Sequence, residues 1–159
     1  MYTSCFKKLF PALLLILAAT EINAQPAGSA AEDSIRHIVN TTFIAMKESD
    51  TILLKTCFTE GALLQTFAPG KGGKTTIVTE TVSSFARSIA SLPKGMADEQ
   101  VEFERIQIDG HMAAVWAPFK LFLNGKFYSC GVNNIQLVRL NNEWKIQYIL
   151  DTRRKDNCK

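Results

Sequence analysis

The chain has 159 residues, of which 47% are hydrophobic and 21% charged, and its formal net charge at pH 7 is +3. This length and apolar content suffice for one domain with a buried core, and they exclude a disordered or fibrous protein. The small positive charge gives no argument for nucleic-acid binding, and four cysteines are too few for a disulfide-rich scaffold.

Residues 1–24 have the pattern of a secretory signal peptide. Two lysines precede an apolar run, residues 9–20, and Ala24 offers a small residue at a cleavage site before Gln25. The alternative is an uncleaved membrane anchor, but the run is shorter than the roughly 20 apolar residues that a spanning helix needs. We therefore expect an exported protein, periplasmic or secreted, without a membrane partner after cleavage.

The segment after the cleavage site begins with a leader of small residues, 25–32, which we expect to be flexible. A helix is expected from Asp33 or Ser34, either of which can cap it, to about Ser49. Its apolar residues recur at spacings of three and four and form one stripe: Ile35, Ile38, Val39, Phe43 and Met46. Asp50 can cap a short second helix that contains three apolar residues: Leu53, Leu54 and Phe58.

A short hairpin and a third helix come next. Residues 62–67 and 75–78 have the composition of strands, and the glycine-rich stretch 69–73 between them predicts a turn. An apolar pattern over residues 82–92 predicts the third helix, which Pro93 ends. The helices are therefore expected on both sides of the hairpin in the chain.

The rest of the chain has the pattern of an antiparallel sheet. Four strands are expected in succession, separated by short turns: 101–108, 111–123, 126–140 and 143–152. Asn124-Gly125 favours a two-residue turn, and we expect another at Asn141-Asn142. The order predicts an α+β domain, residues 33–155, in which three N-terminal helices pack on a strongly curved, mostly antiparallel sheet, with a C-terminal tail at 156–159.

The last hairpin has an apolar strand and a polar turn over 135–142, followed by Trp144-Lys145-Ile146. With the order of the elements, this ending resembles the nuclear transport factor 2-like superfamily, and further similar segments point to its small bacterial members: 114–119, 125–127, 130–133 and 151–154. The resemblance covers residues 33–155. It implies a cystatin-like cone with a cavity beneath the helices, and a homodimer formed through the outer face of the sheet.

The resemblance implies several classes of function, because this fold carries many activities. We favour an exported domain that holds an apolar or amphipathic small molecule in the cone cavity. The alternative is a cofactor-free isomerase, dehydratase or cyclase with an acid–base residue in that cavity, although no catalytic motif of those enzymes matches here. A third is an interaction protein whose cone is filled by its own side chains.

Four residues are candidates for contact with the ligand: Trp116, Phe119, Asn133 and Tyr148. With a two-residue turn at 141–142, Asn133 faces Leu150 across the last hairpin and shares a face with Tyr148. A buried amide there binds a ligand or is satisfied by the backbone. Trp116 is near Pro118, which indicates a bulge at the cavity mouth.

Asp151 and His111 are the candidates for acid–base chemistry. Asp151 ends the last strand, and desolvation would raise its pKa; the alternatives are solvent exposure or a salt bridge with Arg153 or Arg139. Strand alternation places it opposite Tyr148 unless a bulge intervenes. His111 has a suitable pKa and follows a turn. With His37 the only other histidine, and no cysteine or carboxylate at matching spacing, we expect neither a metal nor a cofactor.

Three cysteines follow the signal peptide, so at least one is not paired within the chain. Cys57 lies by an apolar helix end and is expected to be buried. The strand pairing places Cys130 near Arg153, so a tail that folds back can join Cys130 to Cys158 in an oxidising compartment. The alternative is a reactive thiol at Cys130.

Overall fold

The computed structural model describes residues 29–158, so the predicted signal peptide and the leader up to residue 28 lie outside the described residues. The elements follow in this order: α1 (Ser29–Lys47), α2 (Thr51–Thr56), β1 (Phe58–Pro69), the one-turn helix η1 (Lys71–Gly73), β2 (Thr75–Thr81), α3 (Val82–Ala90), β3 (Ala97–Val101), β4 (Arg105–Asp109), β5 (Met112–Leu123), β6 (Lys126–Leu140) and β7 (Glu143–Arg154). No helix in this part of the chain is long and apolar enough to cross a membrane.

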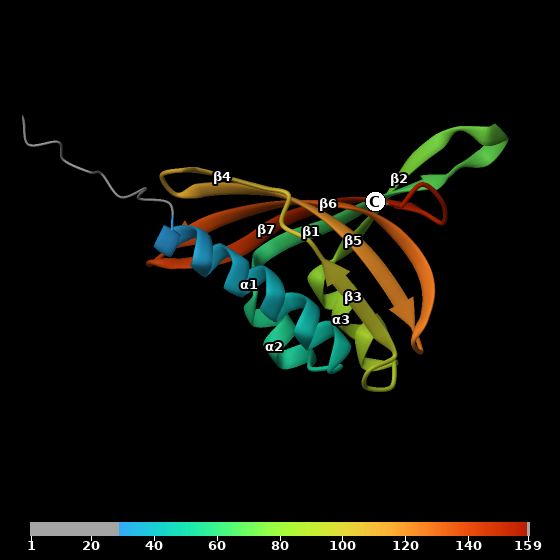
Figure 1. Cartoon of the computed structure of the whole chain (residues 1–159), viewed down its shortest axis with the longest axis horizontal. Coiled ribbons are helices and arrows are strands. Elements are labelled where there is room, and N and C mark those ends of the chain that lie inside the picture. The colour runs from blue at the N-terminus through green and yellow to red at the C-terminus, as the bar shows by residue number, and fades with distance from the viewer. Residues whose placement is uncertain (1–28, 159) are drawn as a thin grey trace, which may run out of the picture.

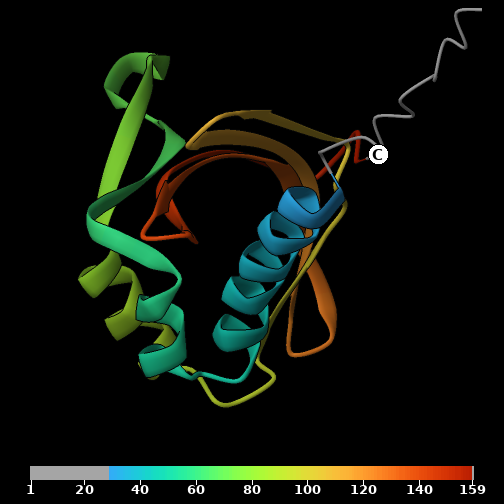
Figure 2. The same ribbon diagram turned by 90° about the vertical axis from the view of Figure 1, so that its left-hand side faces the viewer.

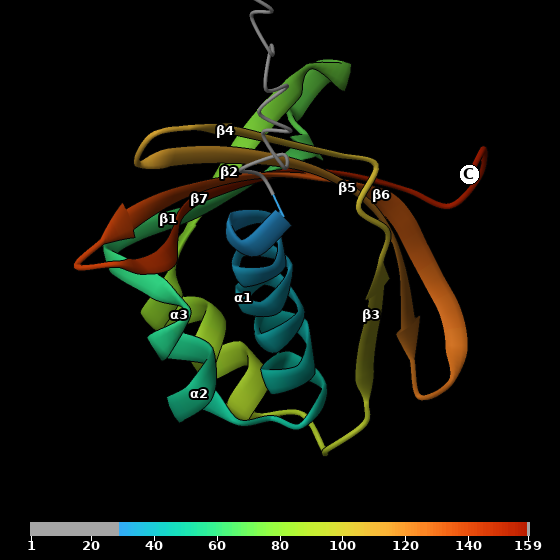
Figure 3. The ribbon, with the colours of Figure 1, turned by 60° about the vertical axis from the view of Figure 1, so that its left-hand side comes forward.

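The strands form a single sheet in the order β2-β1-β7-β6-β5-β3, with β4 also paired to β5. Neighbouring strands are antiparallel except β1 and β7, which are parallel. The sheet is strongly curved, and Figure 3 shows the helices on its concave side. In Figure 2 the sheet arches over α1, and in Figure 1 the β1–β2 hairpin extends beyond the rest of the domain.

α1 packs against the sheet through the stripe that its sequence predicts. Ile35 and Val39 have no exposed surface, and Thr42 and Met46 continue the buried face. The helix begins at Ser29, earlier than the expected cap at Asp33 or Ser34, so residues 29–32 of the predicted leader are helical. Caps start the next two helices: Asp50 accepts hydrogen bonds from two amides of α2, and Thr81 accepts one from α3.

Two strand expectations need correction. Phe58 begins β1 rather than ending the second helix, because it pairs with Ile146 of the parallel neighbour β7, a contact far away in sequence. The strand expected at 101–108 is divided into β3 and β4, which occupy successive parts of one edge of β5. The division lies opposite Pro118, which has no N–H to donate to the ladder.

Both predicted two-residue turns are confirmed. Asn124 and Gly125 have φ of 50° and 71°, and Asn141 and Asn142 have φ of 49° and 67°. Two successive left-handed residues give a turn whose twist matches that of antiparallel strands. These turns fix where β6 and β7 begin.

β7 contains one extra residue relative to β6. Leu137 pairs with Ile146 but Gln136 pairs with Tyr148, so Gln147 has no partner in this ladder. The inner face of β7 therefore changes from even to odd positions. Asn133 pairs with Asp151, and the expectation that it faces Leu150 is wrong because a simple turn count omits this bulge.

A disulfide between Cys130 and Cys158 fastens the end of the chain to β6. The pairing partner of Cys130 is Arg154, one position beyond the expected Arg153 because of the bulge. Cys57 is a free cysteine without exposed surface. Burial raises the pKa of its thiol, which disfavours the reactive thiolate.

Breaking the Cys130–Cys158 bond should lower the free energy of unfolding. The bond spans 28 residues, and closing a loop of that length stabilises a protein by about 3–4 kcal/mol. Urea unfolding of the parent and of Cys158→Ser, each with and without reductant, measures the effect. Reductant should bring the parent to the stability of the variant and leave the variant unchanged. A parent insensitive to reductant would contradict this.

Candidate functional site

A cavity of about 250 Å³ lies between the helices and the concave face of the sheet. Its apolar wall comes from both helices and strands: Phe43, Met46, Leu64, Val78, Phe85 and Ile149. Its charged groups come from strands alone: Glu80, Glu99, Asp151 and Arg153. Such a mixture of an apolar wall and a few converging polar groups is typical of small-molecule sites.

Strand pairing places the polar side chains next to one another. Asn133 of β6 and Asp151 of β7 are direct partners, and Thr66 of β1 is the partner of Asp151 on its other side. Glu99 comes from β3, and its Oε1 accepts a hydrogen bond of 2.8 Å from Nδ2 of Asn133. Side chains from four strands, β1, β3, β6 and β7, therefore lie together in one polar region.

Asp151 is ion-paired within this region. Arg153 donates from Nε to Oδ1 at 3.0 Å and from Nη2 to Oδ2 at 2.8 Å, and the hydroxyl of Thr66 also donates to Oδ1. Asp151 as a whole residue is 9% exposed. Of the alternatives for Asp151, the structure has the salt bridge, and the partner is Arg153 rather than Arg139.

Glu99 has a different environment. Desolvation raises the pKa of its carboxyl to about 7, further raised by Asp151 and opposed by the Asn133 hydrogen bond and by Arg153. No lysine or arginine among residues 29–158 forms an ion pair with it. Near neutral pH, Glu99 is therefore divided between its acid and its anion, while Arg153 compensates the charge of Asp151.

Glu99 is not among the site residues predicted from the sequence. The predicted strand starts at residue 101, so Glu99 lies before it and was assigned to neither face of the sheet. The alternation of Ala97, Glu99 and Val101 with Asp98 and Gln100 is the signal that would have found it, because alternate residues of a strand share a face.

Of the sequence candidates, Asn133 and Asp151 line the cavity, whereas Tyr148, Trp116 and His111 do not. The bulge turns Tyr148 to the outer face, where its hydroxyl donates to Gln65. Trp116 also lies on the outer face, between the buried Val115 and Ala117, and is 46% exposed. His111 is exposed at the turn between β4 and β5. The expectation that these residues share one cavity is therefore wrong.

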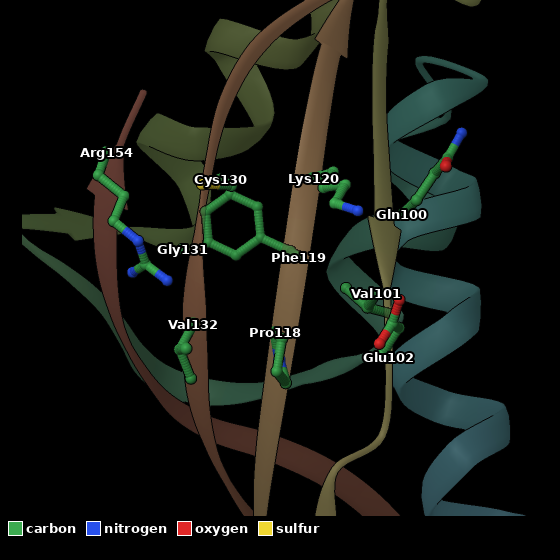
Figure 4. Close-up of a pocket in the computed structure, with 10 residues that line it drawn as sticks. All are labelled: Gln100, Val101, Glu102, Pro118, Phe119, Lys120, Cys130, Gly131, Val132 and Arg154. Atoms are coloured by element: carbon green, nitrogen blue, oxygen red, sulfur yellow. The ribbon is translucent and has the colours of Figure 1, made fainter. Parts of the chain in front are cut away.

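Phe119 is a packing residue in a different place. Its ring lies beside Gly131 (Figure 4), at a hollow that has no lining residue in common with the cavity. A Cβ atom at position 131 would lie 2.7 Å from Cε1 of Phe119 and 1.7 Å from the carbonyl oxygen of Thr152. The glycine lets the Phe119 ring and the β7 backbone approach β6 closely.

Within residues 29–158, no group of three or more His, Cys, Asp or Glu side chains could hold a metal ion. His37 lies in α1, and its neighbourhood is a shallow hollow with Trp144 and Lys145.

Solved structures with the same fold are numerous, although no protein-family model and no curated protein matches the sequence. An NTF2-like protein of unknown function from Silicibacter pomeroyi is 14% identical with a TM-score of 0.64, covering 79% of this chain and 98% of that one. One from Methylobacillus flagellatus is 15% identical with a TM-score of 0.62, covering 80% and 94%. A protein of unknown function with a cystatin-like fold from Nostoc punctiforme is 10% identical with a TM-score of 0.64, covering 80% and 94%.

Replacing Glu99 by Gln should change how stability depends on pH. Because burial raises the pKa of Glu99 to about 7 from 4.5, the parent binds this proton more tightly when folded. The resulting stability is present below pH 4.5 and is lost as pH rises through 7. Relative to the parent, Glu99→Gln should gain about 3 kcal/mol between pH 4 and pH 8.

Urea unfolding across that pH range measures the difference. Glu102→Gln, which changes an exposed carboxyl three residues along the chain, is the matched control and should follow the parent. A constant difference between Glu99→Gln and the parent at every pH would show that Glu99 is not perturbed.

Proposed function

We propose that this chain, whose fold is the cone of the nuclear transport factor 2-like superfamily, holds a small, partly apolar molecule between its helices and its sheet. The observation that carries the proposal is the cavity itself, with an apolar wall and a few polar groups gathered at the end of β7. This space lies where the cone would hold a ligand, between the helices and the concave face of the sheet.

The dimensions of the cavity restrict the ligand. Its volume of about 250 Å³ is below the roughly 300–1,000 Å³ of sites for drug-sized molecules. The ligand is therefore smaller than a typical drug. Its apolar part would contact Phe43, Met46 and Phe85, and a polar group would reach Glu99 or Asn133.

Export is part of the proposal. The pattern of residues 1–24 is that of a secretory signal peptide. A disulfide between Cys130 and Cys158 suits an oxidising compartment such as the periplasm or the medium. The protein would therefore bind its ligand in that compartment.

A second candidate function is acid–base catalysis without a cofactor. It is favoured by one observation: two carboxyls that line the cavity have different surroundings, since Arg153 is ion-paired with Asp151 while desolvation raises the pKa of Glu99 to about 7. A group with a pKa near the working pH both donates and accepts protons efficiently. In this function Glu99 is the acid–base residue, rather than Asp151 or His111, and Asn133 orients it.

We also propose a homodimer that buries the outer face of the sheet. Several apolar side chains are exposed on that face, among them Leu63, Met112 and Trp116. Exposed aromatic and methionine side chains are enriched at interfaces between proteins. The concave face would remain free to hold the ligand.

Filling the cavity mouth should abolish ligand binding. Ser88 of α3 lines the cavity and Ser83 of the same helix does not, although both are exposed. The parent and Ser83→Trp, purified from the native host, should carry a bound small molecule in native mass spectrometry, and Ser88→Trp should be empty. An empty parent, or equal occupancy in both variants, would contradict the proposal.

Placing a charge on the outer face should break the dimer. Trp116→Glu puts a carboxylate where the interface would exclude water, so the variant should be a monomer at concentrations where the parent is a dimer. Light scattering after size-exclusion chromatography measures the mass. Ile52→Glu, at an exposed apolar position on α2, is the control and should remain dimeric. A monomeric parent would refute this part.

A further inference from the structure

The cavity has an excess of negative charge. Glu80 of β2, Glu99 of β3 and Asp151 of β7 line it, and the cation among the described lining residues is Arg153. The lining residues from the two helices are uncharged: Thr42, Phe43, Met46, Phe85 and Ser88. The lining residue from β6 is Asn133, whose amide is neutral. On β5, the residue paired with Glu99 is Leu121, which is also uncharged. No other lining residue offsets the excess.

Arg153 hydrogen-bonds both oxygens of Asp151 and acts on Glu99 only through its charge, since it forms no ion pair with Glu99 among the described residues. Among residues 29–158, the carboxyl of Glu99 accepts one hydrogen bond, from Asn133 to Oε1. Its Oε2 has no donor among the described residues. Oε2 is not fully enclosed by protein atoms. It opens on the cavity, where a donor on a bound molecule can complete its hydrogen bonding.

We propose that the cavity selects an organic cation, a small primary or secondary amine whose ammonium group donates a hydrogen bond to Oε2 of Glu99. Its apolar body packs against Phe43, Met46 and Phe85. This inference rests on the proposed function and names the chemical class of its ligand. An organic anion would add to the negative excess, and a neutral molecule would leave it unchanged.

Binding of a cation is coupled to a proton. The amine requires the ionised form of Glu99, whereas the pKa of about 7 leaves the carboxyl protonated in part of the molecules at neutral pH. Binding therefore releases that proton to solvent. The affinity rises with pH until Glu99 is fully ionised, because an alkyl amine stays protonated to a pH of about 10.

Three probes of nearly equal shape test the charge preference: phenethylamine, phenethyl alcohol and hydrocinnamate. Isothermal titration calorimetry of the full chain at pH 8 should show phenethylamine binding at least about tenfold more tightly than the alcohol. Hydrocinnamate should bind least. For a pKa of about 7, the affinity for phenethylamine should fall about tenfold from pH 8 to pH 6, and that for the alcohol should not change.

Glu99→Gln removes the charge and keeps the shape. It should lose the preference for the amine and retain binding of phenethyl alcohol, while Glu102→Gln should behave as the parent. An alcohol that binds the parent as tightly as the amine would overturn the amine class and leave cavity binding intact. If none of the three probes binds the parent, both the inference and the proposed function fail. The pH dependence in the parent tests the inference even if Glu99→Gln does not fold.

Discussion

The arrangement of the cavity depends on a single extra residue in β7. Gln147 shifts the pairing with β6, so Trp144 and Ile146 face the core before it, and Ile149 and Asp151 do so after it. Without the bulge, strict alternation would turn Asp151 to the outer face and Tyr148 to the inner one. β1 has its own irregularity between Phe58 and Leu63, where Gly61 has φ of 74°, and it remains the parallel neighbour of β7 beyond it.

Asp151 faces inward after the bulge, beside Glu99. The two carboxyls differ because one of them is ion-paired with an arginine and the other is not. Arg153 lies two residues further on the same face of β7 and donates hydrogen bonds to both carboxylate oxygens of Asp151. Glu99 approaches from β3, and among the described residues its carboxyl accepts a hydrogen bond from the amide of Asn133. This bond and the charge of Arg153 compensate its desolvation only in part, and its pKa rises to about 7. Both proposed chemistries derive from this difference: Asp151 is paired with an arginine, and Glu99 has a raised pKa and no ion pair among the described residues.

Much of the fold could be predicted from local patterns. The spacing of Ile35, Val39 and Met46 gives the helix that packs on the sheet, and Asn-Gly and Asn-Asn at the turns give two hairpins. A two-residue turn fixes the pairing of the strands that it joins. Counting from the turn therefore placed Cys130 within one position of its actual strand partner, Arg154, and close enough to Cys158 for the disulfide to be predicted.

The site was less predictable because it depends on contacts far apart in sequence. Counting from the turn gives the wrong partner for Asn133, since nothing in Lys145-Ile146-Gln147-Tyr148 distinguishes a bulge from a regular strand. The parallel pairing of Phe58 with Ile146 has no local signal either. Glu99 belongs to a five-residue strand that is visible only beside β5.

Both proposed chemistries require that Glu99 is a titrating carboxyl in the wall of the cavity. An NMR titration of the side-chain carboxyl carbons, with glutamate labelled with carbon-13, reports this property. One glutamate should have a midpoint near 7, and its signal should be missing in the spectrum of Glu99→Gln. If every glutamate instead titrates near the ordinary value of about 4.3, Glu99 is solvated and neither chemistry holds.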